Sequence, residues 1–463
     1  MRRVLVGLWM ALLAGCGLQD AFVGDGTVVA RAGNHRLTLR QLADFMVMRE
    51  LLPLDAPLVE RWAWWWVEYS LFAQRVGAGD SLLDSASVVQ ARWPDVRAAM
   101  VDSMYARLAE QRLALTEATL DSAYAAGDLL PIDQILISAP ASLSPEERAR
   151  KRRRAEAVRA RLVGGGTWAA ANEANEDPGS RATGGSIGVI TWGTMVPEFE
   201  QAAFALEPGE ISPVTRTVYG YHIIRRPRLD EVREDYARVV EDTLYWRMRD
   251  AYTAQLVDRW EVRLEPRAPE MIRQAAEQPN RAKHSADRIG SFTGGEFTVS
   301  NFIRWLQVLP SAEHEAIRRS NDDELRDLAR RVIRYDLEWL EAQNAGIVLP
   351  DSEFVRIKRR LARDIALVWG LLAVDSVRGE TTSARSEDDV IATAVYGYLV
   401  RFAGLPGQVR FERVPAFLPD KLREEAEWSI RYGLMDRVLE RAAELRAALD
   451  SAEAAVDTGG GRR

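Results

Sequence analysis

The chain has 463 residues, enough for about three domains of roughly 150 residues each. Hydrophobic residues make up 47% of it and charged residues 28%, which is ordinary for a soluble globular protein. The formal net charge is −7, and an acidic chain argues against nucleic acid as a partner, because phosphate binding relies on clustered Lys and Arg. The single cysteine, Cys16, excludes a disulfide within the chain, and the four scattered histidines argue against a zinc site.

The first sixteen residues have the order of parts found in an export signal. Two arginines precede an apolar run over 4–13, which is too short to span a bilayer of ~30 Å as a helix. The run ends in LAGC at 13–16, which resembles the bacterial lipobox. The resemblance implies that residues 1–15 are a lipoprotein signal peptide and that Cys16 carries a lipid. The alternative is an ordinary secretory signal in which Cys16 is incidental.

The lipobox also implies a location. Residues 16–27, rich in Gly and Asp, are predicted to be a tether between the lipid and the folded chain. A chain with several acyl groups is stably anchored. The protein is therefore expected in the cell envelope, as a membrane-anchored lipoprotein that faces the periplasm or the extracytoplasmic space.

Residues 28–130 are predicted to be a mainly helical region that begins with a hairpin. Val28 starts a strand, Gly33-Asn34 forms a tight turn, and Thr38 caps the following helix. A similar pattern occurs over 292–309, where Thr298 takes the place of Thr38. This indicates an internal repeat, with coincidence as the alternative. The aromatic segment 62–66 fits either a buried helix face or a surface that holds unfolded clients.

Residues 131–227 contain several short blocks in a characteristic order. A buried strand is predicted over 132–138 and a helix over 146–163, closed by three glycines. The blocks that follow are DPGS at 177–180, GGSIG at 184–188, MVPEF at 195–199, AFAL at 203–206, PGEIS at 208–212 and GYHII at 220–224. Together they resemble the parvulin (PpiC-type) rotamase family. The resemblance implies a small antiparallel sheet flanked by helices and peptidyl-prolyl isomerase activity.

Rotation about an X–Pro bond requires no nucleophile, metal or cofactor, and none is expected here. The barrier of ~18–20 kcal/mol comes from amide resonance. An enzyme lowers it by binding the twisted amide more tightly than the planar one, in an apolar pocket that grips the proline ring. By similarity to the family, the walls of that pocket are Ile187, Met195 and Phe199. The alternative for Met195 and Phe199 is a purely structural place in the core.

The resemblance also assigns the polar residues of the site. It implies that His222 lies beneath the pocket with Thr217 nearby, and that Asp177 lies close to the rotating carbonyl, although Pro178 competes for that place. Gln134 stands where the family usually has His. Gln can donate and accept hydrogen bonds at once, but it cannot carry a positive charge. The alternatives are that His222 is a core histidine and that Gln134 is only structural.

Two further features of this segment are expected to be structural. Ser186 stands where the family commonly has Asp in a glycine turn. The pattern GGSIG over 184–188 also fits the nucleophile elbow of serine hydrolases. However, residues 189–191 look like strand, and no Asp lies between Ser186 and His222, so a serine nucleophile is excluded.

Residues 228–455 are predicted to be mainly helical, with one helix over 351–377, another over 419–453, and a disordered tail at 456–463. The predicted fold is α+β: a parvulin domain joined to a mainly α-helical body like those of SurA- and PrsA-like foldases.

This plan predicts a peptidyl-prolyl isomerase and chaperone. Its expected partners are unfolded or nascent exported proteins with proline-containing segments, together with the membrane through the lipid anchor, and no nucleic acid. The alternatives are a catalytically weak or inactive parvulin-fold holdase or assembly scaffold, and a structural lipoprotein without clients.

Overall fold

The computed structural model describes residues 27–48, 54–309, 311–380, 386–404 and 409–459. The predicted signal peptide, the lipid attachment at Cys16 and nearly all of the predicted tether lie outside these residues. Within the described ranges, no helix is long and apolar enough to cross a membrane. The same ranges contain no group of three or more His, Cys, Asp and Glu placed to hold a metal ion.

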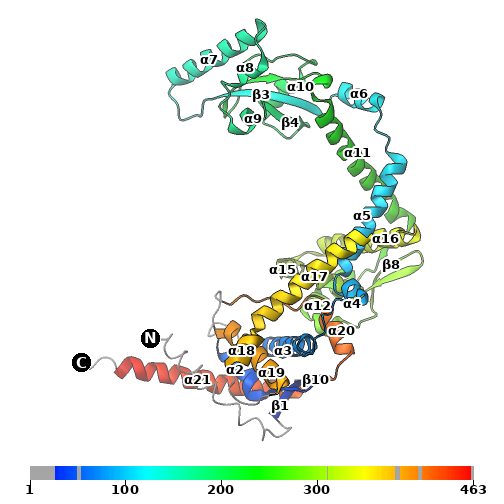
Figure 1. Ribbon diagram of the computed structural model, residues 1–463, viewed down its shortest axis with the longest axis vertical. Helices are drawn as coiled ribbons and strands as arrows, with labels where there is room; N and C mark the ends of the chain where they lie inside the picture. The colour runs from blue at the N-terminus through cyan, green and yellow to red at the C-terminus, as the bar shows by residue number, and fades with distance from the viewer. Residues whose placement is uncertain (1–26, 49–53, 310, 381–385, 405–408, 460–463) are drawn as a thin grey trace.

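The molecule has two parts that long helices hold apart (Figure 1). A sheet module over 130–227 stands at one end, and a larger helical body forms the other. This confirms the predicted fold class of a small antiparallel sheet joined to a mainly helical body. The helices of the connecting limb are α5 Trp93–Arg112, α6 Glu117–Ala126 and α11 Leu229–Arg259.

The sheet of the module has four antiparallel strands in the order β4-β3-β6-β5. Alternate residues of a strand point to opposite faces. Ile135 and Ile137 therefore pack under α7, whereas Ile132 packs with α10 on the other face. The elements of the module are β3 Leu130–Ser138, α7 Pro145–Val163, α8 Trp168–Asn172, α9 Pro178–Ala182, β4 Ser186–Ile190, α10 Pro197–Phe204, β5 Thr215–Arg216 and β6 Gly220–Arg225.

The first lobe of the body combines both ends of the chain. Its core contains buried residues from 29–96 and from 357–442, so the sequence before the module packs on sequence far after it. A three-stranded sheet has the order β10-β1-β2. The elements are β1 Val28–Ala32, β2 His35–Thr38, α2 Leu39–Val47, α3 Ala56–Gly77, α4 Ser85–Ala91, α17 Asp351–Leu372, α18 Val374–Glu380, α19 Glu387–Gly404, α20 Leu418–Glu424, β10 Trp428–Ile430, η4 Tyr432–Leu434 and α21 Met435–Gly459.

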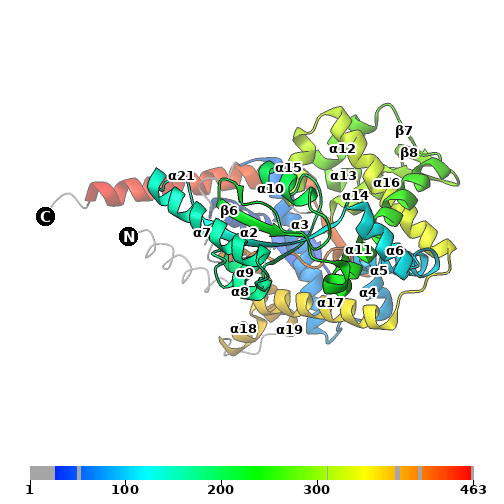
Figure 2. The ribbon, with the colours of Figure 1, turned by 90° about the horizontal axis from the view of Figure 1, so that it is seen from above.

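The second lobe has a separate core, built from residues 101–105 of the limb and residues 252–347. Its sheet has the order β7-β8-β9. Seen from above, this lobe lies on the side of the body opposite to the projecting end of α21 (Figure 2). The elements are β7 Arg263–Leu264, α12 Ala268–Glu277, α13 Pro279–Ala282, β8 Arg288–Phe292, β9 Gly295–Thr298, α14 Val299–Leu306, α15 Ser311–Arg319 and α16 Asp322–Asn344. The predicted regions 28–130 and 228–455 thus contribute jointly to both lobes.

The predicted hairpin and its helix cap are confirmed. Gly33, at the turn between β1 and β2, has a φ of 53°, in the left-handed region where glycine is unstrained. Thr38 caps α2: its hydroxyl accepts from the amide of Gln41 at 3.2 Å, and the Gln41 side chain accepts from the amide of Thr38 at 2.9 Å. Strand, turn and capped helix recur at 288–306, so the predicted repeat is also present.

The prediction of one long helix over 419–453 is wrong. The chain forms α20, then the strand β10, and only then α21. Residues 428–430 are extended because they pair with β1 and satisfy the backbone groups of its open edge. The helix predicted over 351–377 ends at Leu372, because Ala373 takes the left-handed conformation with a φ of 55°. At the other end, α21 reaches Gly459 and so extends into the predicted tail.

Candidate functional site

The strands β3 and β6 bring Gln134 and His222 to one face of the sheet. Leu136 pairs with His222 in this antiparallel ladder. Gln134, two residues before Leu136, therefore shares a face with His222, since side chains alternate along a strand. Phe199 of α10 lies on the same side, with its ring edge-on to the imidazole at 5.3 Å.

Four side chains predicted for the site form one hydrogen-bonded chain. Gln134 Nε2 donates to Asp177 Oδ2 at 3.0 Å. Gln134 Oε1 lies 3.0 Å from His222 Nδ1, and Thr217 Oγ1 lies 2.7 Å from His222 Nε2. The structure thus brings Asp177, Gln134, His222 and Thr217 together in this order.

The carboxylate at one end fixes the direction of every hydrogen bond. An ionised carboxylate only accepts, so the amide NH₂ of Gln134 must face Asp177 and its oxygen must face His222. His222 then carries its proton on Nδ1 and accepts from the Thr217 hydroxyl at Nε2. The Thr217 oxygen in turn accepts from the amide of Tyr219 at 3.1 Å. Each donor in the chain has an acceptor.

The charges of the two ionisable groups follow from their surroundings. Burial lowers the pKa of the His222 imidazole to about 4, although the nearby Asp177 charge acts in the opposite direction. A hydrogen bond from the Ser180 hydroxyl, at 2.6 Å, holds the pKa of the Asp177 carboxyl below its ordinary value. At neutral pH the site therefore contains a neutral imidazole and a single carboxylate.

Asp177 is positioned by the start of α9, which it caps. Its carboxylate accepts from the amide of Ser180 at 3.2 Å and from the amide of Gly179 at 3.4 Å. Pro178 is the first residue of that helix, where its missing N–H costs nothing. Of Asp177 and Pro178, the structure brings the Asp177 side chain into contact with Gln134, and Pro178 begins the helix.

Two residues that the sequence reasoning missed hold this loop in place. Asn175 is fully buried; its side-chain oxygen accepts from the amides of Leu136 and Asp177, at 3.0 and 3.1 Å. Its NH₂ group donates to the carbonyl of Gln134 and to Ser180 Oγ, both at 3.1 Å. Ser180 has a detectable signal, because it lies three residues after a capping Asp. Asn175 looks like any polar loop residue in the sequence.

The three predicted pocket walls have different environments. Phe199 is buried in a cluster with residues of β3, β4 and β6, and Ile187 packs against that cluster. Met195 is 38% exposed, and its amide donates to Glu200 Oε1 at 2.8 Å. Trp192 and Tyr219, which were not predicted, are also largely exposed. Phe199 and Ile187 are therefore part of the core of the module, whereas Met195 lies at its surface.

Ser186, which was expected to be structural, lies at the start of strand β4. Its hydroxyl accepts from the amide of Gly188 at 3.2 Å, within strand β4. β4 is followed by turn residues, not by the helix that a nucleophile elbow needs. Both ring nitrogens of His222 are already engaged by Gln134 and Thr217.

The module is fastened to the limb by buried hydrogen bonds. The Arg226 guanidinium donates to the carbonyl of Leu206 at 3.1 Å and to that of Tyr124, on α6, at 2.8 Å. The Tyr124 hydroxyl donates to the carbonyl of Pro227 at 2.7 Å. Tyr236 of α11 packs edge-on against Tyr124 at 5.5 Å. These contacts fix the orientation of the site relative to the two limb helices.

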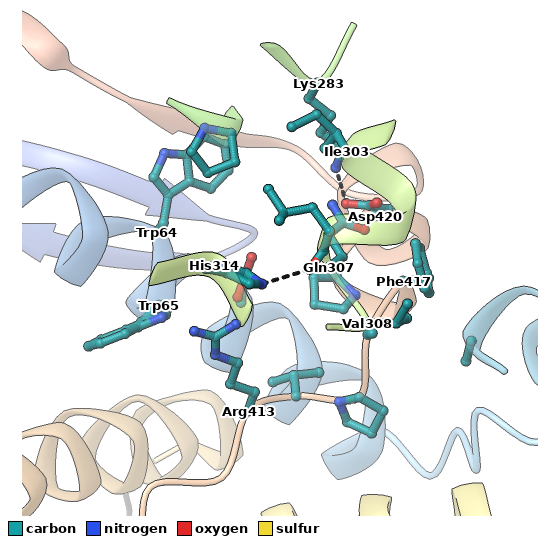
Figure 3. A pocket seen from close by; sticks show the side chains of 18 of the residues that line it. Trp64, Trp65, Lys283, Ile303, Gln307, Val308, His314, Arg413, Phe417 and Asp420 are labelled. Atoms are coloured by element: carbon teal, nitrogen blue, oxygen red, sulfur yellow. Dashed lines mark hydrogen bonds and ion pairs between the residues drawn. The ribbon is translucent and has the colours of Figure 1, made fainter. Parts of the chain in front are cut away.

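A second candidate site is a cavity of about 840 Å³ between the two lobes of the body (Figure 3). Trp64 and Trp65 of α3 face it from the first lobe, and His314 of α15 faces it from the second. Arg61 and Arg413 line it, and neither forms an ion pair with another described residue. The lining contains as many Asp and Glu as Lys and Arg, so the cavity combines aromatic surface with charges of both signs. Of the segment 62–66, Trp62 and Trp66 are buried core, whereas Trp64 and Trp65 are partly accessible.

Residues 135–227 match the family model described as "PPIC-type PPIASE domain" (Rotamase). Over 72 residues the chain is 49% identical to "Foldase protein PrsA" of Caldanaerobacter subterraneus subsp. tengcongensis, covering 15% of this chain and 24% of that protein. Over 94 residues it is 39% identical to "Chaperone SurA" of Chromohalobacter salexigens, covering 19% of this chain and 22% of that protein. The chain thus spans about a quarter of the length of these relatives.

Among solved structures, the chain is similar to PrsA from Bacillus subtilis, with 21% identity over 48% of this chain and 87% of that chain and a TM-score of 0.21. A PpiC-type peptidyl-prolyl cis-trans isomerase domain matches with 21% identity over 22% of this chain and 89% of that chain, with a TM-score of 0.20.

Proposed function

Since residues 135–227 carry a PpiC-type domain, we propose that the protein is a peptidyl-prolyl isomerase that also acts as a chaperone. The hydrogen-bonded chain from Asp177 to Thr217, beside Phe199, carries this proposal. The site thus contains an ionised carboxylate and an apolar ring. An X–Pro bond has one part for each of them: the carbonyl that rotates and the proline ring.

The chemistry is non-covalent. Phe199, Met195 and Ile187 hold the proline ring, and the carbonyl of the preceding residue turns next to Asp177. The resonance form that makes the C–N bond partly double places negative charge on the carbonyl oxygen. A carboxylate held close to that oxygen disfavours this form, and so favours the twisted amide over the planar one. Gln134, His222 and Thr217 position Asp177 and do not exchange protons with the substrate.

The direct test is the isomerisation rate of a short peptide with one X–Pro bond, measured with and without the full chain. Acceleration in proportion to protein concentration is expected. If the rate equals that in buffer while the protein is folded, the isomerase assignment fails.

The body is proposed to hold extended client segments in the cavity between its lobes. Trp64 and Trp65, together with Arg61 and Arg413, which have no ion pair within the described part of the chain, favour segments that carry aromatic and acidic side chains. The clients are unfolded or newly exported proteins with proline-containing segments. Suppression of the aggregation of an unfolded test protein measures this activity separately from isomerisation.

A second candidate function keeps the fold and drops the catalysis. Gln134 favours it, because this residue cannot take the positive charge that a histidine can. In that case the module is a peptide-binding platform of a holdase or an assembly scaffold. Aggregation would then be suppressed without any acceleration of the peptide.

The place of action follows from the sequence of residues 1–16. The protein is proposed to be a lipoprotein attached through Cys16 to a membrane of the cell envelope, with the folded parts in the periplasm or extracytoplasmic space. The foldases and chaperones that the module resembles are consistent with a role in protein folding at that location.

A further inference from the structure

The hairpins of the two lobes agree residue by residue. In β1–β2 the pairs are Val28 with Thr38, Ala30 with Leu37, Arg31 with Arg36 and Ala32 with His35, with a bulge after Val28. In β8–β9 the pairs are Arg288 with Thr298, Gly290 with Phe297, Ser291 with Glu296 and Phe292 with Gly295, with a bulge after Arg288. Every position in the second hairpin is the first position plus 260. A shared register that includes a bulge is not expected from two unrelated hairpins.

The helices that follow the hairpins agree as well. Thr298 caps α14 as Thr38 caps α2: Asn301 accepts from the amide of Thr298 at 2.9 Å, where Gln41 accepts from that of Thr38 at the same distance. Phe302, the counterpart of Leu42, is fully buried like Leu42 itself. The match therefore extends from the strands through the helix cap into both cores.

Each hairpin is completed by a strand and a helix that come from elsewhere in the chain. Ser429 of β10 pairs with Arg31, and Arg263 of β7 pairs with Ser291, the counterpart of Arg31. The amide of Arg431 donates to the carbonyl of Val29 at 2.8 Å, and the amide of Glu265 donates to that of Ile289 at 2.9 Å. These two strands differ by a constant 166 in residue number. The helices that follow them, α21 and α12, pack on α2 and α14 respectively.

The order of these parts along the chain shows an exchange. β7 and α12 come after the first hairpin but complete the second, whereas β10 and α21 come after the second hairpin but complete the first. We propose that the body is a pseudo-dimer within one chain: two copies of one folding unit that have exchanged their terminal strand–helix arms, of which only the first copy carries an isomerase module.

The contact at the centre of the body has the form that a two-fold relationship requires. The Arg92 guanidinium pairs with Asp364, and the Arg360 guanidinium pairs with Asp95 at 3.1 Å. Arg92 lies on the segment that leads out of the first unit, and Arg360 lies on the corresponding helix of the second. The same arginine–aspartate contact thus occurs twice with the roles of the two copies exchanged. Reciprocal contacts of this kind mark isologous interfaces.

The two copies differ in the helices that connect each unit to its arm. These helices are called the first limb (α5, α6 and α11) and the second limb (α17, α18 and α19). α5 leaves the first unit, and α11 returns along α16 of the second unit to reach β7. In the same way, α17 leaves the second unit, and α19 returns along α3 of the first to lead to β10. The first limb carries the module at its tip. In the second limb, α17 to α19, the described residues between the two long helices form the short helix α18 (Figure 1). The edges of β1 and β8 that would receive another chain's arm are occupied from within, so the protein is expected to be a monomer with one module.

Pairs of engineered cysteines in the full chain can distinguish this arrangement from one without exchange, in which β7 would pair with β1 and β10 would pair with β8. Cys16→Ser removes the native thiol. Arg31→Cys with Ser429→Cys, and Arg263→Cys with Ser291→Cys, join strands that are paired here, at distances that a disulfide spans. The crossed combinations, Arg31→Cys with Arg263→Cys and Ser291→Cys with Ser429→Cys, join the strands that would be paired without exchange.

Under mild oxidation of the native protein, both paired combinations should lose their two free thiols and both crossed combinations should keep them. Closure of a crossed combination within one chain would overturn the exchange, as would paired combinations that stay reduced in protein of native fluorescence. Disulfides between two chains, or a dimeric mass by light scattering, would show exchange between molecules and overturn the single-chain arrangement. None of these results depends on isomerase activity.

Discussion

The side-chain oxygen of Gln134 accepts the Nδ1 proton of His222 across 3.0 Å, while the NH₂ of the same amide faces Asp177. The Gln134 side chain therefore has two effects. Its oxygen fixes the tautomer of the His222 imidazole, and its NH₂ group offsets part of the negative charge of the Asp177 carboxylate. A neutral histidine at position 134 would also have one donor and one acceptor. The departure from the family pattern thus preserves the hydrogen-bond pattern and gives up only the ability to become charged.

Replacing Gln134 tests this interpretation. Gln134→His should retain isomerase activity to within about threefold, because a neutral imidazole can donate to Asp177 and accept from His222. Gln134→Leu should lower kcat/KM about tenfold or more, since it leaves the buried Nδ1–H of His222 unpaired, which costs about 1–3 kcal/mol. Equal activity of the leucine variant and the parent would show that the network does not serve catalysis.

Met195→Ala tests the proline pocket with little effect on the fold. Met195 is 38% exposed, so its truncation should lower kcat/KM about tenfold without a shift in Tm. Phe199→Ala should lower activity more, but Phe199 is buried, and its loss should also cost about 3–5 kcal/mol of stability.

Met271→Ala, at a partly buried position on α12 of the body, is the matched control. It should leave the peptide assay unchanged. Loss of activity in this control as large as that in Met195→Ala would contradict the assignment of the pocket.

The pH profile should reveal a site without a titrating histidine near neutrality. The pKa of His222 is lowered to about 4, so isomerase activity should be flat between about pH 8 and pH 5. Stability should respond differently. The unfolded chain binds this proton near the ordinary value of 6.5, so the free energy of unfolding should fall as the pH drops from about 6.5 to about 4, by about 3 kcal/mol from this group.

Denaturant titrations of the parent and of His222→Gln at a series of pH values measure this contribution. The variant should show a shallower loss of stability over that pH range. A parent activity profile with a midpoint near 6.5 would mean that His222 titrates in the folded protein, contrary to its burial.

Arg413→Glu tests the cavity of the body. Reversing the charge of this cavity-lining residue, which has no ion pair among the described residues, should weaken suppression of aggregation several-fold, with no change in the peptide assay. Arg359→Glu provides a matched control, because Arg359 is exposed on α17, does not line the cavity and forms no ion pair with another described residue. If both variants suppress aggregation equally well, clients do not bind in this cavity.

Cys16→Ser tests the anchor. Without a thiol at this position no thioether to lipid can form, so the protein should move from the membrane fraction to the soluble fraction after cell lysis. Mass spectrometry of the parent should show acyl chains on Cys16. Unchanged membrane association of the variant would count against the lipobox.

The sequence predicted the parts of the molecule whose signals are local. A few neighbouring residues determine each of these elements: the strand β3, the helix α7 with the glycines at its end, and the helix cap at Thr38. The membership of Gln134, Asp177, Thr217 and His222 in one site came from the family resemblance, and the geometry brings all four together. Asn175 was missed, because a buried asparagine is recognised only by the amides around it.

The strands of the two arms, β7 and β10, could not be predicted from the sequence for a different reason. Trp428-Ser429-Ile430 is three residues long, too short for a strand period, and it lies between helical segments whose spacing continues on either side. What makes it a strand is an edge about 400 residues earlier in the chain. No local pattern encodes such a partner, and the same holds for β7.

The position of β10 and α21 also sets when the protein can finish folding. During synthesis from the N-terminus, the first hairpin is made about 400 residues before β10, the strand that pairs with it. The module over 130–227 has its own core and needs neither lobe, so it can fold first. A protein truncated before Trp428 would then contain a folded module on an incomplete body, and the edge of β1 that pairs with β10 would be free to capture a strand from a neighbouring molecule.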